Sequence, residues 1–355
     1  MYSYSRLMDF CEKLFAEMGC STDDAQIISK VLLEAELHGL SSHGMLRVRD
    51  IYELYKAGRI NTKAQPRIVH ESPSTATVDG DGGIGIVAAH FAMKVAIEKA
   101  KNAGTGWVAV KNSNHFGIAG YYAEMAVEND MVGVSMTNAN PLVAPTFSVS
   151  RMLGTNPLAV AIPTGNQPTF VADFATTPIA RGKLAIMGKQ GKSVPHGYVQ
   201  DAAGVPSTDP DIITRGGAIV PLGGDYEHGS HKGFCMGALI DIFSSVFSGA
   251  NFGPFVPPQV AYLPLLDKSV GEGLGHFFGA MRIDAFRTAE EFKGSMDEWI
   301  ETFRGAKPAD GQDRVYIPGD IEREKKARIL SDGIVLVEAV EKDLKEIGAE
   351  FSIEL

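Results

Sequence analysis

The sequence has few cysteines, fewer basic than acidic residues, and no long apolar run. Its 355 residues include only Cys11, Cys20 and Cys235, which are too few and too scattered for a disulfide framework or a cysteine-rich zinc site. Such sparse cysteine fits a reducing cytoplasm. Lys and Arg number 33 against 43 Asp and Glu. The net charge of −10 argues against a general nucleic-acid binder, which needs a basic stripe.

Membrane insertion and secretion are not expected either. The richest apolar segment, residues 233–249, is interrupted by Asp241 and several serines, and no run of about 18 apolar residues exists. The first residues read as an amphipathic helix rather than a secretory signal, because Arg6, Asp9 and Lys13 interrupt the apolar positions. No histidine or cysteine spacing matches a zinc motif, so we expect no metal.

Hydrophobic periodicity predicts an α+β protein. Residues 3–70 read as helices, with a capping box at Ser21 and Asp24 and a further helix from Ser41 or Ser42 to Gly58. Strand-like and helical runs then alternate irregularly, which favours a partly antiparallel sheet over a regular βαβ series. The strand-like runs are STATVDG, GWVAVKN, MVGVSMTN, LAVAIP and TFVADFAT, and the helical runs start at Ile86 and Gly120.

The chain divides into three parts by these patterns. We expect an N-terminal helical region over 1–72, a sheet core over 73–305 that is rich in glycine and proline, and a C-terminal helical segment over 306–355. The last part carries one long amphipathic pattern over 322–348.

Gly80, Gly82 and Gly85 satisfy the G-x-G-x-x-G pattern between a strand-like and a helix-like run. The acidic residue that would bind a ribose after the next strand is missing, and Lys111 stands there instead. Lys111 could meet a 2′-phosphate if the loop binds a dinucleotide. We favour the alternative, a turn that lets a helix pack closely on a sheet.

Three histidine segments could carry chemistry. In HGLSSHGMLR, a helix starting at Ser42 would put His43 and Arg47 one turn apart, and its dipole would lower the pKa of His43. A proton donor beside an arginine fork suits the reduction of a 2-oxo acid. A capped helix with solvated polar residues explains the pattern equally well.

The other two segments, KNSNHFGIAGYY and GSHKGF, place His115, His231 and Lys232 beside helix starts. Free backbone N–H groups there could hold phosphate or a nicotinamide amide. An ordinary strand-to-helix turn and a helix cap are the alternatives.

Together these segments resemble the type-2 malate/L-lactate dehydrogenase family of NAD(P)-dependent 2-hydroxy acid dehydrogenases and cyclic imino acid reductases. Further matching pieces are MLGTNPLAVAIPT, DFATTPIARGK, GVPSTDP, PLGG, GHFFGAMRID and VYIPGD, which occur in family order. The resemblance implies a non-Rossmann NAD(P)-binding fold with a largely antiparallel central sheet, packed by the N- and C-terminal helices. It also implies a homodimer.

The resemblance assigns roles to individual residues. His43 resembles the proton donor and Ser42 its hydroxyl relay partner. The implied substrate contacts are Arg47, which would hold the carboxylate, and Thr155, Arg181 and Gly182. The implied contacts to NAD or NADP are His115, Phe116, Gly117, Ile118, Ala119, Asp173, Phe174, Ala175, Lys232 and Arg304.

We therefore expect hydride transfer between NAD(P)H and C2 of a small 2-oxo acid. Oxaloacetate and malate come first and pyruvate and lactate next. Ureidoglycolate, sulfolactate and a cyclic imino acid are alternatives, because residues 183–197 match the family poorly. A serine hydrolase with Ser42 or Ser113 as nucleophile is the competing class, although no G-x-S-x-G elbow occurs.

Overall fold

A computed structural model describes all residues, 1–355, as a mixed helix and sheet structure that confirms the α+β class. The helices are α1 (Tyr4–Glu17), α2 (Thr22–Leu37), α3 (Leu46–Lys56), α4 (Gly85–Ala103), α5 (Ala119–Val127), α6 (Arg181–Lys189), α7 (Ser230–Asp241), α8 (Ala289–Arg304), α9 (Asp320–Asp332) and α10 (Glu338–Glu350), with short turns η1 (Ser41–His43), η2 (Ile212–Arg215), η3 (Ile242–Val246), η4 (Gly253–Phe255) and η5 (Ile283–Ala285). A helix with the length and apolarity needed to cross a lipid bilayer is not found.

The central sheet has the strand order β1-β2-β3-β10-β4-β5-β6. Only β2 and β3 are parallel neighbours, and every other neighbouring pair is antiparallel. A small second sheet has the order β8-β7-β9. The strands are β1 (Arg67–Glu71), β2 (Thr75–Asp79), β3 (Thr105–Ser113), β4 (Met131–Thr137), β5 (Leu158–Ile162), β6 (Phe170–Phe174), β7 (Val199–Gln200), β8 (Pro206–Ser207), β9 (Ala218–Ile219) and β10 (Leu274–Arg282).

Three expectations about these elements were wrong. Residues 67–71 form strand β1 and not a helix, because they pair with β2 at the edge of the sheet. The helix expected from Ser41 or Ser42 is a short turn that ends at Gly44, and α3 begins only at Leu46. The C-terminal pattern forms two helices, because the chain breaks at Gly333, whose φ is +94°.

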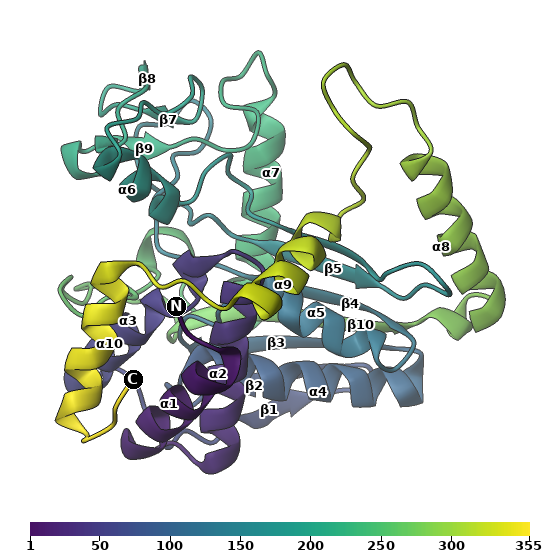
Figure 1. Ribbon diagram of the computed structural model, residues 1–355, viewed down its shortest axis with the longest axis horizontal. Coiled ribbons are helices and arrows are strands. Elements are labelled where there is room, and N and C mark those ends of the chain that lie inside the picture. Colours follow the sequence, from purple (N-terminus) through teal and green to yellow (C-terminus); the bar gives the residue numbers. More distant parts are fainter.

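Two buried apolar clusters hold the larger part of the molecule together. One joins α1, α2 and α3 to the C-terminal residues Ile334, Leu336, Val340, Leu344 and Ile347. Figure 1 shows α1, α3 and α10 gathered at one end of the molecule. The other lies between the sheet and helices α4 and α5, where small alanines let the helices approach the strands closely. A third, smaller cluster belongs to α6 and the β7–β9 sheet.

The loop around Gly80, Gly82 and Gly85 is held by contacts to the end of β3 and to Asn114. Backbone N–H groups of Gly80 and Gly82 donate to the carbonyls of Lys111 and Asn112. A Cβ on Gly85 would overlap the Asn114 carbonyl. These contacts agree with the turn that we favoured, although β2, α4 and β3 do form one βαβ unit.

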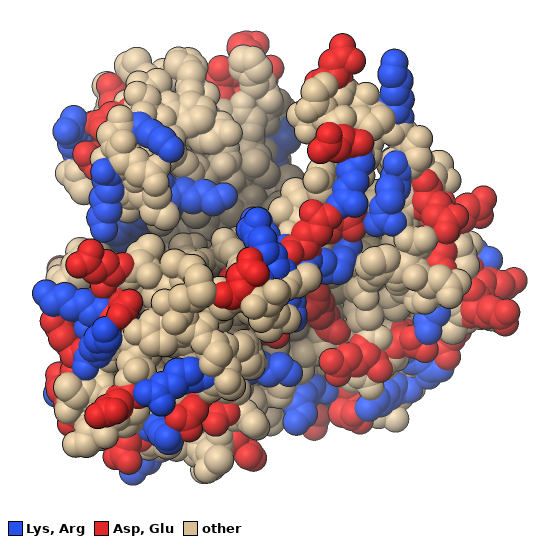
Figure 2. Space-filling view, in the orientation of Figure 1, with Lys and Arg blue, Asp and Glu red and all other residues tan.

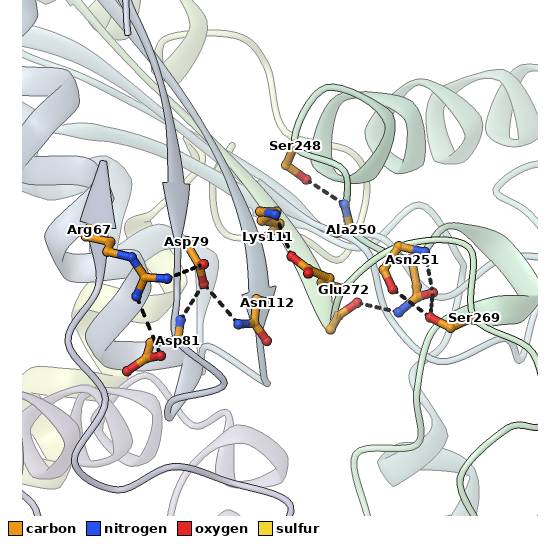
Figure 3. A network of polar contacts seen from close by, with 12 residues as sticks. Arg67, Asp79, Asp81, Lys111, Asn112, Ser248, Ala250, Asn251, Ser269 and Glu272 are labelled. Atoms are coloured by element: carbon orange, nitrogen blue, oxygen red, sulfur yellow. Dashed lines mark hydrogen bonds and ion pairs between the residues drawn. The ribbon is translucent and has the colours of Figure 1, made fainter. Parts of the chain in front are cut away.

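A polar network at this edge occupies the residues that a dinucleotide would need. Asp79 accepts from Arg67, from the Asp81 N–H and from Asn112, while Lys111 pairs with Glu272 (Figure 3). Lys111 is therefore paired with Glu272 within the protein, and its contact with a 2′-phosphate stays a prediction.

Candidate active site

One pocket, of about 270 Å³, brings together residues from distant parts of the chain. Ser42 and His43 come from η1, Arg47 from α3, and His115 from the turn between β3 and α5. The predicted residues that line it are Ser42, His43, Arg47, His115, Phe116, Gly117, Thr155, Arg181 and Gly182.

The buried imidazole of His43 lies close to a hydroxyl and to a second imidazole. Its Nδ1 lies 3.0 Å from the hydroxyl of Ser42, and its ring centroid lies 5.4 Å from that of His115. Burial and, to a smaller extent, the neighbouring Arg47 together lower the pKa of His43 to about 4. The cause is thus burial and a nearby cation, and the expected helix dipole is not needed, because α3 starts only after His43.

His115 is also neutral at ordinary pH. Burial places its pKa well below the usual 6.5, with Arg47 and His43 adding to the effect. Its Nδ1 accepts from the Gly117 N–H at 3.3 Å, so the ring proton is on Nε2. The two imidazoles can therefore offer one N–H donor and one proton acceptor to the same bound group.

The guanidinium of Arg47 is held by two hydrogen bonds and keeps some of its N–H groups free. Its Nε donates to the Ser42 carbonyl at 2.9 Å, and its Nη1 donates to Asp50 Oδ2 at 2.8 Å. Two of the five N–H hydrogens of the guanidinium are used, which leaves three for a ligand. A planar cation held in this way suits a carboxylate.

Arg181 lies at the start of α6, where that helix packs against η1. No carboxylate lies within ion-pair distance of Arg181, and its Nη2 donates to the hydroxyl of Tyr262 at 3.1 Å. An added Cβ on Gly182 would lie 3.0 Å from Ser42 Cβ, so this position needs a residue without a side chain. A second cation thus lines the pocket from the start of α6.

The remaining predicted residues lie outside this pocket. Asp173 is the next-to-last residue of strand β6 and is followed by Phe174 and Ala175, and its carboxylate accepts from the Gly120 N–H at 2.8 Å. Burial raises the pKa of Asp173 to about 6 against the lowering effect of the Gly120 N–H, with a smaller contribution from Glu322. Ile118 and Ala119 begin α5 at the same place. These residues form a second group, near the first turn of α9.

Arg304 and Lys232 differ in whether their charge is already paired within the protein. Arg304 binds Asp320 and the Gln167 side chain, so its guanidinium is already engaged. Lys232, in the first turn of α7, has no carboxylate within ion-pair distance. Helix α7 packs near the chain that follows β6, since the Gly237 backbone faces Thr176.

The sequence analysis did not find several lining residues. Asp50 follows Arg47 by three positions, and this helical spacing could have indicated their pairing. Thr137, Asn138, Gln259 and Tyr262 reach the pocket from β4, the residues after it, and a long loop. No local pattern in the sequence marks them. No group of three or more His, Cys, Asp and Glu side chains is arranged to hold a metal ion.

Neutral imidazoles, a hydroxyl and an arginine around one pocket define an enzyme site for a small carboxylate. A family model for malate/L-lactate dehydrogenase matches residues 2–345. A malate dehydrogenase of Pyrococcus horikoshii is 37% identical over 350 residues, covering 98% of this chain and 95% of that protein. An L-sulfolactate dehydrogenase of Methanocaldococcus jannaschii is 38% identical over 339 residues, covering 96% and 94%.

Solved structures agree with the sequence comparison. The crystal structure of malate dehydrogenase from Entamoeba histolytica matches with a TM-score of 0.93 at 34% identity, over 99% of this chain and 98% of that one. The chain belongs to the malate/L-lactate dehydrogenase family. It is an oxidoreductase of the NAD(P)-dependent 2-hydroxy acid dehydrogenase class.

Proposed function

We propose that this chain interconverts oxaloacetate and malate, with His43 as the proton donor and acceptor. The observation that carries the proposal is the single pocket in which Ser42, His43 and Arg47 meet the unpaired Arg181. Two cations that line one pocket suit a substrate with two acid groups. The names of the malate and sulfolactate dehydrogenases among the relatives fit such a substrate.

The chain's own residues supply the proton chemistry. When bound, the reduced nicotinamide supplies the hydride that adds to C2 of the 2-oxo acid. Arg47 holds the C1 carboxylate, and His43 gives its proton to the carbonyl oxygen as negative charge develops there. Because the pKa of His43 is about 4, the ring takes up a proton from water before each reduction, and the hydroxyl of Ser42, 3.0 Å from its Nδ1, would relay it. In the reverse direction, neutral His43 takes the proton from the substrate hydroxyl.

The second group of predicted residues fits a dinucleotide. Phe174 is 38% exposed and can stack on a ring, and Lys232 is a cation without an internal partner. Residues 115–117, which line the pocket, lead into α5, whose first turn contacts Asp173. We propose that residues 115–119, 173–175 and Lys232 hold NAD or NADP without a Rossmann fold. Arg304 would contribute through the N–H groups that its bonds to Asp320 and Gln167 leave unused.

We also propose a homodimer in the cytoplasm. Large apolar side chains stay exposed along α7 and η3, and they include Leu239 at 56%, Val246 at 61% and Phe247 at 61%. A patch of this kind marks a protein interface. The three cysteines are free thiols, as a reducing compartment requires. Sedimentation velocity should give a dimer, and Val246→Asp should weaken it.

A panel of 2-oxo acids, each assayed with NADH and NADPH by loss of reduced-nicotinamide absorbance, tests the proposed reaction. Oxaloacetate should give the highest kcat/KM. Higher kcat/KM with pyruvate, a ureidoglycolate-derived oxo acid or a cyclic imino acid would move the chain to another branch of the family, whose members include a ureidoglycolate dehydrogenase and a piperideine-2-carboxylate reductase. The comparisons give the serine hydrolase alternative no support.

A further inference from the structure

We propose that Glu36 is the positioning residue of the catalytic turn: its buried carboxylate holds both η1, which carries Ser42 and His43, and the start of α3, which carries Arg47. Glu36 lies near the end of α2 and is only 4% exposed. It does not line the pocket, so it acts through the residues that do.

The contacts of Glu36 span both ends of the turn. Oε2 accepts from the hydroxyl of Ser41 at 2.6 Å, and Oε1 accepts from the Met45 N–H at 2.7 Å. Met45 is the N-cap residue of α3, and its own side chain caps nothing. The first N–H groups of a helix have no partner within the helix, so Glu36 satisfies one from outside. The three residues between the two contacts are Ser42, His43 and Gly44.

Gly44 shows how closely the carboxylate fits. A Cβ at Gly44 would overlap the Oε1, Cδ and Cγ atoms of Glu36. The chain can therefore pass over the carboxylate only with glycine at this position. The carboxylate thus packs directly against the backbone of Gly44, the residue that follows His43.

Glu36 has no cation to balance its charge. No Lys, Arg or His lies within ion-pair distance of it, and burial raises its pKa. A buried acid without a counter-charge costs stability. Its two hydrogen bonds both go to the catalytic turn, so the benefit that offsets this cost is the geometry of the turn.

Two substitutions at Glu36 distinguish the effect of its negative charge from the effect of its two hydrogen bonds. In Glu36→Gln, the amide oxygen can still accept from the Met45 N–H while the amide nitrogen donates to the Ser41 hydroxyl. In Glu36→Ala both bonds are lost. Glu34→Ala is the matched control, because Glu34 is a partly buried acid on the same helix that pairs with Lys326 and does not touch the turn.

The inference rests on the proposed role of His43, so one readout does not depend on turnover. The pKa of His43 in the free protein is measured by NMR of ¹³C-labelled histidine, with the resonance assigned by its loss in His43→Gln. We expect a value near 4 in wild type and Glu36→Gln. In Glu36→Ala the loosened turn admits water, and the pKa should move toward 6.5. Glu34→Ala should match wild type.

Kinetics supply the second readout. Glu36→Ala should lower kcat for the 2-oxo acid roughly 10- to 100-fold, because a misplacement of about 1 Å has this effect. Its affinity for NADH or NADPH should stay within about twofold of wild type, and Glu36→Gln should restore kcat to within a few-fold. If wild type reduces no 2-oxo acid, the proposed function fails, and the NMR titration still decides the role of Glu36.

The result that overturns the inference is a folded Glu36→Ala with wild-type kcat and a His43 pKa near 4. Should that variant not fold, Glu36→Leu makes the same test, because it fills the space and removes the buried charge. If neither variant folds while Glu36→Gln behaves as wild type, Glu36 serves folding alone and the positioning role is rejected.

Discussion

Replacing Arg47 by lysine tests the proposed carboxylate contact most directly. The guanidinium is anchored by the Ser42 carbonyl and by Asp50, which orients its remaining N–H groups into the pocket. Two of these groups can bind the two oxygens of a carboxylate side by side. Lysine keeps the positive charge but has no fork, so it can place only one short bond on the carboxylate.

The expected effect follows from the loss of one charge-assisted hydrogen bond. Such a bond contributes about 1.5–3 kcal/mol. At about 1.4 kcal/mol for each factor of ten, KM for the 2-oxo acid should rise roughly 10- to 150-fold. The affinity for NADH or NADPH should change little, because the predicted dinucleotide contacts lie around Asp173 and Lys232.

The assay measures initial rates with oxaloacetate and pyruvate at saturating reduced nicotinamide. Arg49→Lys is the control, because Arg49 lies on the same helix but pairs with Asp343 and Glu346 outside the pocket. An Arg47→Lys enzyme whose KM stays within twofold of wild type for every 2-oxo acid would refute the reasoning. The carboxylate would then bind elsewhere, and Arg181→Lys would be examined next.

Three further outcomes are expected. His43→Ala should lower kcat roughly 10²- to 10⁴-fold while circular dichroism shows a folded protein; a fall of only a few-fold in both directions would exclude His43 as the acid. Burial lowers the pKa of His43 to about 4, so kcat/KM for oxidation should be constant at neutral pH and fall below pH 4. By contrast, kcat/KM for reduction should fall as pH rises above 4. Parallel pH profiles for the two directions would contradict the role of His43. His276 is fully buried and its pKa is lowered to about 3. Below about pH 6.5 the unfolded chain therefore binds a proton at this histidine while the folded chain does not. The free energy of unfolding therefore falls as pH drops below about 6.5. Measured by urea unfolding, it should fall by about 2 kcal/mol more for wild type than for His276→Gln between pH 7 and pH 5. Equal losses in the two proteins would show that His276 is not responsible.

The sequence by itself determined the local elements and the family. The serine cap of α2 forms as predicted, with Ser21 Oγ accepting from the Asp24 N–H, because a cap depends on residues three positions apart. The five strand-like runs became β2 to β6, since alternation along the chain reflects local burial. The motifs around His43 and His115 predicted the family that the comparisons show.

The tertiary structure decided which distant residues meet. Strand β10 lies between β3 and β4, far from both in the sequence, and none of the predicted runs includes it. Tyr262 reaches the pocket from a loop without a local pattern. Long-range pairing depends on how whole elements pack, which spacing along the chain does not encode.

Glu36 illustrates the same limit for a single residue. In the sequence it is one of several acids in a helical stretch, and its neighbour Glu34 has the same residue type. Folding buries Glu36 against the turn at Gly44 and leaves Glu34 paired with Lys326. Identical side chains thus acquire different tasks, because burial and hydrogen-bond partners are set by the packing of α2 against η1 and α9.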